Sequence, residues 1–250
     1  MDKEKYLDRI KYTGGLKPNL DLLKRLQKNH LLNIPFENLD IHYKVPIELN
    51  IDRIYEKIVQ NNRGGFCYEL NGLFYELLRS LGFRVKRVSA RVYNKDNGYS
   101  PEFDHFTIIV KIGNADYLTD VGFGEFIFEP LELKLGKIQN DDRGRYSFDI
   151  YEDGYLRVNK IEDRTSTPEF IFKKVERELV EFKEMCEYHQ SNPNSHFMKK
   201  RLISLPTING RITISGNILK VTENKKVIEK ELKNETEFEK ALWDKFKITI

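Results

Sequence analysis

Cysteine is scarce in this chain of 250 residues, which has only Cys67 and Cys186. Two cysteines cannot form the disulfide framework of a small secreted domain, and they are typical of a protein from a reducing compartment. No segment approaches the roughly 18 uncharged apolar residues that a membrane-spanning helix needs. The charged start, MDKEKYLDRI, has no apolar signal core. These features predict a cytoplasmic protein that does not bind membranes.

A strong charge imbalance is also absent. The chain has 42 Lys and Arg residues against 39 Asp and Glu residues, a net charge of +3. This near-balance argues against a protein whose main partner is nucleic acid. Because there is no Cys-x-x-Cys or His-x-x-x-His spacing, no metal site is expected either. The 40% hydrophobic and 32% charged residues are typical of a globular protein.

Periodic patterns divide the chain into three regions. Residues 1–83 carry apolar side chains at helical spacing, and residues from about 84 form β-branched and aromatic strand patterns. The segment 168–188 has mixed helical spacing, and short strands and a helix follow it. Helices, then strands, then a mixed region indicate an α+β fold, because an α/β fold would alternate the two. We predict domains at 1–83, 84–195 and 196–250.

Cys67 lies in the segment NRGGFCYELN, where a helical pattern begins at or just after the cysteine. Unpaired backbone N–H groups in the first turn of a helix favour an anion, so a thiol there can ionise more easily when a cation is near. Gly64 and Gly65 allow a tight turn and the close approach of a substrate. The competing interpretation is that Cys67 is a small buried hydrophobic residue and the glycines only end a loop.

His105 differs from the other histidines because it opens an apolar strand. If Gly113 and Asn114 form a two-residue hairpin loop, paired positions sum to 227 and Asp120 lies opposite Thr107. Side chains two residues apart on a strand share a face. His105 and Asp120 would then be diagonal neighbours within reach of each other.

Cys67, His105 and Asp120 together supply a nucleophile, a base and an acid that orients the base. Each residue alone has an ordinary structural explanation, but the combination predicts a catalytic triad. Cys186 has no such set of partners and is predicted to be structural.

Several segments, in the same order along the chain, resemble the arylamine N-acetyltransferase family. They are IPFENLD at 34–40, RGGFCYELN at 63–71, DHF at 104–106 and DVGFG at 120–124, with a fainter echo from Tyr188 to Phe197. The resemblance is strongest over 34–131. It implies an N-terminal helical bundle, a central β-barrel and a C-terminal mixed α/β lid.

The resemblance also implies an activity: transfer of acetyl from acetyl-CoA to the nitrogen of arylamines, arylhydrazines or N-hydroxyarylamines, as in xenobiotic metabolism. Cys67 would be the acyl-accepting nucleophile, His105 the base and Asp120 the orienting acid of a ping-pong mechanism. Glu37 and Arg63 would form an ion pair near the nucleophile. An aromatic acceptor needs an apolar wall, for which the candidates are Phe36, Phe103, Phe123 and Phe126.

Three other functions would use the same residues or fold. They are an amide synthase of the same fold, a papain-like cysteine hydrolase and a binding module without activity. The residues around Cys67 do not resemble the papain signature, and the chain shows no propeptide. An intact set of Cys67, His105 and Asp120 argues against a binding module.

Overall fold

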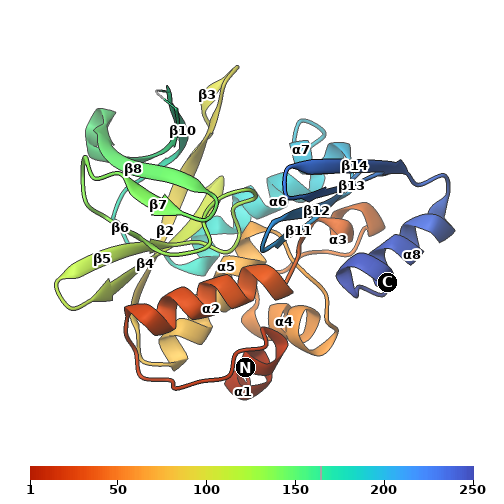
Figure 1. The fold of residues 1–250 in the computed structure, drawn as a ribbon, viewed down its shortest axis with the longest axis horizontal. Helices are drawn as coiled ribbons and strands as arrows, with labels where there is room; N and C mark the ends of the chain where they lie inside the picture. Colours follow the sequence, from red (N-terminus) through yellow and green to blue (C-terminus); the bar gives the residue numbers. More distant parts are fainter. Residues whose placement is uncertain (164) are drawn as a thin grey trace.

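Helices dominate the first 80 residues of the computed structural model, which describes residues 1–163 and 165–250 (Figure 1). The helical spacing predicted from the sequence is therefore confirmed in this region. The exception is a short strand, β1, just after Pro35. Helix α2 ends before this strand, because a proline disfavours helix in the residue that precedes it. The elements are α1 (Lys3–Arg9), α2 (Leu20–Asn33), β1 (Phe36–Glu37), α3 (Leu39–Tyr43), α4 (Ile51–Tyr55), the π-helical turn η1 (Glu56–Gln60) and α5 (Cys67–Ser80).

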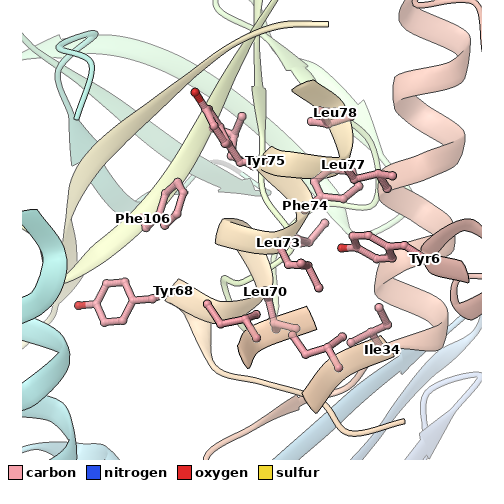
Figure 2. Close-up of a cluster of buried hydrophobic side chains, with 14 of the residues drawn as sticks. Tyr6, Ile34, Tyr68, Leu70, Leu73, Phe74, Tyr75, Leu77, Leu78 and Phe106 are labelled. Carbon is pink, nitrogen blue, oxygen red and sulfur yellow. The ribbon is translucent and has the colours of Figure 1, made fainter. Parts of the chain in front are cut away.

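Helix α5 is the buried centre of the helical region. Figure 2 shows its apolar side chains between those of neighbouring elements, with Tyr6 of α1 on one side and Phe106 of the barrel on the other. Because nearly every residue from Cys67 to Leu78 is buried, the position of this helix is fixed on all sides. The residue at its first turn is therefore held rigidly.

The strands that follow form one antiparallel, barrel-like sheet (Figure 1). Its order is β6-β5-β4-β2-β10-β9-β8-β7, and β3 (Gly98–Tyr99) pairs with β2. The side-chain amide of Gln139 in β7 joins the two ends, because it accepts from the backbone N–H of Glu132 and donates to its carbonyl, both at 2.8 Å. The strands are β2 (Arg84–Asn94), β4 (His105–Ile112), β5 (Ala115–Thr119), β6 (Leu131–Glu132), β7 (Gln139–Asp141), β8 (Gly144–Tyr151), β9 (Tyr155–Glu162) and β10 (Thr165–Phe172).

A second sheet, β1-β11-β12-β13-β14, packs against helix α8 (Glu235–Phe246) through its own apolar cluster. Its first strand comes from the helical region, since Phe36 of β1 pairs with Ser204 of β11. The second sheet is thereby joined to the segment that leads to Cys67. Its other strands are β11 (Leu202–Thr207), β12 (Gly210–Ser215), β13 (Ile218–Glu223) and β14 (Lys226–Glu231).

The helix predicted from the mixed spacing at 168–188 is wrong for the first part of that segment. Residues Thr165–Phe172 form strand β10, because Phe170 and Phe172 fill the barrel interior. The helices begin later, with the 3₁₀ turn η3 (Leu179–Phe182), α6 (Lys183–Ser191) and α7 (His196–Lys199). The domain boundary at 195 stays a prediction. Within the described ranges, no helix is both long and apolar enough to span a membrane.

Candidate active site

Cys67 is the first residue of α5, as the sequence predicts. The carboxylate of Glu69 accepts a hydrogen bond from the backbone N–H of Phe66 at 3.1 Å, which closes the first turn of the helix. Lys57 holds that carboxylate from the other side, with Nζ 2.8 and 2.9 Å from its two oxygens. The start of α5, where Cys67 lies, is thus fixed by a buried charge pair.

The predicted pair of Glu37 and Arg63 is confirmed. Arg63 Nε donates to Glu37 Oε1 at 2.9 Å, and Arg63 Nη2 also donates to Asp40 at 2.7 Å. Asp40 contacts Lys57 at 2.7 Å in turn, so these ion pairs connect to the one that holds Glu69. A continuous charge network therefore supports the loop before Cys67.

Gly64 permits the close approach of two backbone segments in front of Cys67. A Cβ at Gly64 would lie 2.2 Å from the carbonyl oxygen of Pro35, far inside van der Waals contact. Next to it, Glu37 N–H donates to the Gly65 carbonyl at 2.8 Å. The absence of a side chain at position 64 is what lets β1 lie against the nucleophile loop.

We expect Gly64→Ala to lower the free energy of unfolding by about 3 kcal/mol, since a rigid backbone contact cannot give way as a flexible side chain can. Urea denaturation followed by circular dichroism measures the change. Gly15→Ala is the matched control because no atom lies within 4 Å of its added Cβ. Equal midpoints for the two variants would contradict the steric argument.

The hairpin that joins β4 to β5 brings His105 and Asp120 together. The observed register pairs Ile108 with Thr119 and Ile112 with Ala115, which confirms the predicted two-residue loop. His105 Nε2 lies 2.7 Å from Asp120 Oδ2, and both side chains are buried. Since Nε2 faces the carboxylate, Nδ1 is the ring nitrogen left for a reacting group.

Asp120 is held by four donors. Its Oδ1 accepts from Asn71 Nδ2 and from the backbone N–H groups of Gly122 and Phe123, each at 2.9 Å, while Oδ2 faces His105. Burial opposes ionisation, but the charge of His105 and these hydrogen bonds hold the pKa of Asp120 below its ordinary value. Asp120 is therefore a carboxylate that fixes the orientation of the imidazole.

Asn71 is a functional residue that the sequence reasoning missed. It lies one turn after Cys67 on α5, and its amide donates to Asp120 while its Oδ1 accepts from Val121 N–H at 2.8 Å. Its position four residues after the nucleophile, on the same helix face, was the available signal. A Cβ at Gly122 would lie 2.7 Å from the Cys67 carbonyl, so this loop packs directly on the start of α5.

Burial, with Asp104, Cys186 and Asp120 nearby, raises the pKa of the Cys67 thiol well above its ordinary value. The helix start alone therefore does not ionise the thiol, and easier ionisation was expected only with a cation nearby. A thiolate in this site needs a proton acceptor that becomes positively charged beside it. His105 lines the same cavity and is the residue that can serve as that acceptor.

Cys67 and His105 open into a cavity of about 500 Å³. Two of the four predicted aromatic residues, Phe36 and Phe123, line it. The other two pack elsewhere: Phe103 contacts Phe182 edge-on with ring centres 5.2 Å apart, and Phe126 lies in the barrel core against Phe123 and Phe170. The remaining lining residues are Val92, Asp104, Gly122, Gly124, Glu125, Glu169, His196, Phe197, Leu202, Ser204, Arg211 and Thr213.

Several of these lining residues come from α7 and the second sheet. Arg211 crosses between the two sheets, since it donates to Ser204 Oγ at 2.8 Å and to the Gly124 carbonyl at 3.1 Å. Sequence patterns gave no signal for the residues of the second sheet, because their place depends on pairing between β1 and β11 across more than 160 positions of the chain. For His196 and Phe197 the signal was the weak resemblance over residues 188–197. Among the described residues, no group of three or more His, Cys, Asp or Glu side chains could hold a metal ion.

Comparisons with known proteins agree with this geometry. The N-acetyltransferase family model matches residues 19–250. The pineal gland arylamine N-acetyltransferase isozyme NAT-3 of Gallus gallus is 31% identical over an alignment 276 residues long. The alignment covers 100% of this chain and 95% of the relative.

Solved structures give the same result. The Mycobacterium marinum arylamine N-acetyltransferase in complex with CoA is 30% identical, with a TM-score of 0.90 over 99% of this chain and 93% of that one. A Bacillus cereus arylamine N-acetyltransferase, described with a Cys-His-Glu catalytic triad, is 27% identical, with a TM-score of 0.91 over 99% of this chain and 98% of that one.

Proposed function

Since this chain belongs to the arylamine N-acetyltransferase family, we propose that it transfers acetyl from acetyl-CoA to arylamines in two half-reactions through an acetyl-thioester on Cys67. The observation that supports this most directly is the buried pair of His105 and Asp120 at 2.7 Å in a cavity shared with Cys67. Acetyl-CoA is a co-substrate, and none of the proposed steps uses a metal.

In the first half-reaction, His105 takes the proton of the Cys67 thiol through Nδ1. The sulfur then attacks the thioester carbonyl of acetyl-CoA, the new C–S bond forms, and CoA leaves with the proton from His105. Asp120 stabilises the imidazolium while it exists. The backbone N–H groups of the first turn of α5 are candidate donors to the oxyanion.

In the second half-reaction, the lone pair of the amine attacks the acetyl carbon. His105 accepts a proton from the nitrogen, the C–S bond breaks, and the sulfur takes that proton from His105, which regenerates the Cys67 thiol. A weakly basic arylamine suits this step because it is largely unprotonated near neutral pH. We propose that Phe36 and Phe123, together with Phe197, form the wall for its ring, and that Phe126 supports Phe123 from behind. Phe103 contacts Phe182 and is not part of this wall.

The proposed chemistry also bears on the cellular compartment and the metabolic role of the enzyme. An oxidised Cys67 could not carry an acetyl group, so the chemistry needs a reducing compartment, and we propose the cytoplasm. Acceptance of varied aromatic nitrogens would suit xenobiotic metabolism. The apolar lining of the cavity beside the nucleophile supports an aromatic acceptor.

Intact-mass spectrometry tests the proposal. We expect incubation with acetyl-CoA to add one acetyl group, located on Cys67 by peptide mapping, and an added arylamine to remove it with formation of the acetylated amine. If the protein does not acquire the acetyl group and no CoA is released, the proposal is wrong. Turnover of a peptide bond in preference to acetyl-CoA would instead indicate a cysteine hydrolase. Formation of a biosynthetic amide bond in place of amine acetylation would indicate an amide synthase.

A further inference from the structure

A second acid–imidazole pair lies in the wall of the same cavity. Asp104 Oδ1 is 3.2 Å from His189 Nε2, and the two side chains are 16% and 2% exposed. Asp104 lines the cavity together with Cys67 and His105. The mechanism described above uses neither Asp104 nor His189.

Asp104 is held in place through both its backbone and its side chain. The hydroxyl of Tyr68, the residue after the nucleophile, donates to the carbonyls of Phe103 at 2.7 Å and Asp104 at 3.2 Å. Phe103 adopts a left-handed backbone conformation with φ of 68°, which is uncommon for a residue with a side chain and often marks functional sites. The chain thus makes a constrained turn immediately before Asp104.

His189 is positioned by its surroundings as well. Its Nδ1 lies 3.2 Å from Ser195 Oγ, and its ring packs edge-on against Phe197 with centres 5.1 Å apart. With Nδ1 engaged by a hydroxyl, Nε2 is the nitrogen that faces Asp104. When protonated, His189 is therefore a cation for that carboxylate in a largely buried setting.

The charge on Asp104 hinders the first half-reaction. Burial opposes its ionisation, but His189, Ser100 and His105 hold the pKa of Asp104 below its ordinary value. Among the charged groups around Cys67, Asp104 contributes most to raising the pKa of the thiol, ahead of Asp120. The first half-reaction therefore gives the Asp104 carboxylate no favourable role, although its side chain lines the cavity beside Cys67.

The second half-reaction offers that role. When a neutral amine attacks the acetyl carbon, its nitrogen becomes positively charged until a proton leaves. A primary arylamine or hydrazine carries two hydrogens on the attacking nitrogen, of which His105 takes only one. A fixed carboxylate close to that nitrogen can accept a hydrogen bond from the other and stabilise the positive charge.

We propose that Asp104 is a further catalytic residue, whose carboxylate accepts a hydrogen bond from the acceptor nitrogen during its attack on the acetyl-thioester, and that His189 is the residue that positions it. The C–N bond forms, one proton passes to His105, and the C–S bond breaks as before. Asp104 gains and loses no proton. The inference rests on the proposed function and adds the group that favours nitrogen acceptors.

The test compares two nucleophiles on one acetyl-enzyme. Wild type and Asp104→Asn are acetylated with acetyl-CoA and mixed with either aniline or CoA, and the loss of the acetyl mass is followed by rapid quench. CoA attacks through sulfur, which gives its single proton to His105 in the reverse of its departure and has no second hydrogen to donate in a hydrogen bond to Asp104. We expect Asp104→Asn to slow attack by aniline by about 100-fold, and to slow attack by CoA at least tenfold less than attack by aniline.

His189→Gln keeps the carboxylate but removes the imidazole that positions it, so we expect a smaller loss of the same kind, again confined mainly to aniline. Asp116→Asn is the matched control, because Asp116 of β5 pairs with Lys174 at 2.9 Å and does not line the cavity. It should change neither rate.

Equal slowing of both nucleophiles in Asp104→Asn would indicate a purely structural role and overturn the inference, as would an unchanged rate with aniline. Should Asp104→Asn not fold, the ratio of the two rates in His189→Gln decides in the same way. If wild-type protein forms no acetyl-Cys67 at all, the proposed function fails, which is a different result from either of these.

Discussion

Cys67→Ser is expected to lower the rate of acetyl-CoA-dependent acetylation of an arylamine by about 10⁴-fold or more. Loss of a catalytic nucleophile typically lowers turnover by this order of magnitude. The substitution exchanges sulfur for oxygen in a buried site at the first turn of α5, so its steric effect is small. A serine hydroxyl is much harder to deprotonate than a thiol, and His105 alone cannot supply the difference. Steady-state turnover and the acetyl adduct on the protein both measure the loss.

Cys186→Ser is the control for this variant. Cys186 is also buried, its sulfur accepts from Gln190 Nε2 at 3.3 Å, and burial raises its pKa to about 12. A serine can accept the same hydrogen bond, so we expect turnover and the acetyl adduct to be kept. Retained turnover in Cys67→Ser together with its loss in Cys186→Ser would move the nucleophile to the other cysteine.

The predictable part of the site depends on local geometry. Whether His105 and Asp120 meet depends on one hairpin loop, and the parity of a two-residue loop puts both on one face of the sheet. The start of α5 at Cys67 is equally local, since it follows a pair of glycines and precedes a long apolar face. Such features need only short-range rules, and for that reason they could be predicted.

The unpredicted part depends on contacts between distant segments. His196, Phe197 and Arg211 reach the cavity only because β1 pairs with β11 and because α6 and α7 pack against the core of the helical region. Asp104 and His189 lie 85 positions apart, and no periodic pattern connects them. The aromatic wall shows the same limit, because all four candidate phenylalanines are apolar and only packing decides which of them face the cavity.

The raised pKa of Cys67 shows the same difference between local features, which the sequence reveals, and contacts between distant segments, which it does not. A helix start favours an anion, and this is visible in the sequence, but burial of the thiol and the presence of three other acidic groups are not. In the structure the second effect prevails. In the proposed mechanism the thiolate is therefore produced together with an imidazolium, which makes the orientation of His105 decisive for activity.

Asp120→Asn is expected to lower turnover by about 10⁴-fold while leaving the fold in place, because it removes the group that sets this orientation. All four groups around the carboxylate donate: Asn71 Nδ2, the N–H groups of Gly122 and Phe123, and His105 Nε2. An asparagine has only one acceptor oxygen. Its NH₂ group must therefore face a donor, either at the loop or at the imidazole.

Three of the donors surround Oδ1, two from the loop and one from Asn71 of α5, so the asparagine oxygen should turn toward them and the NH₂ toward His105. Nε2 then becomes an acceptor, and the proton moves to Nδ1, the nitrogen that should receive the proton of Cys67. Asp120→Glu is the informative comparison, because the Bacillus cereus neighbour is described with glutamate in its triad. It keeps the charge and both acceptors, and we expect it to recover at least part of the lost turnover. Equal activity of wild type and Asp120→Asn would show that the tautomer of His105 does not limit the reaction.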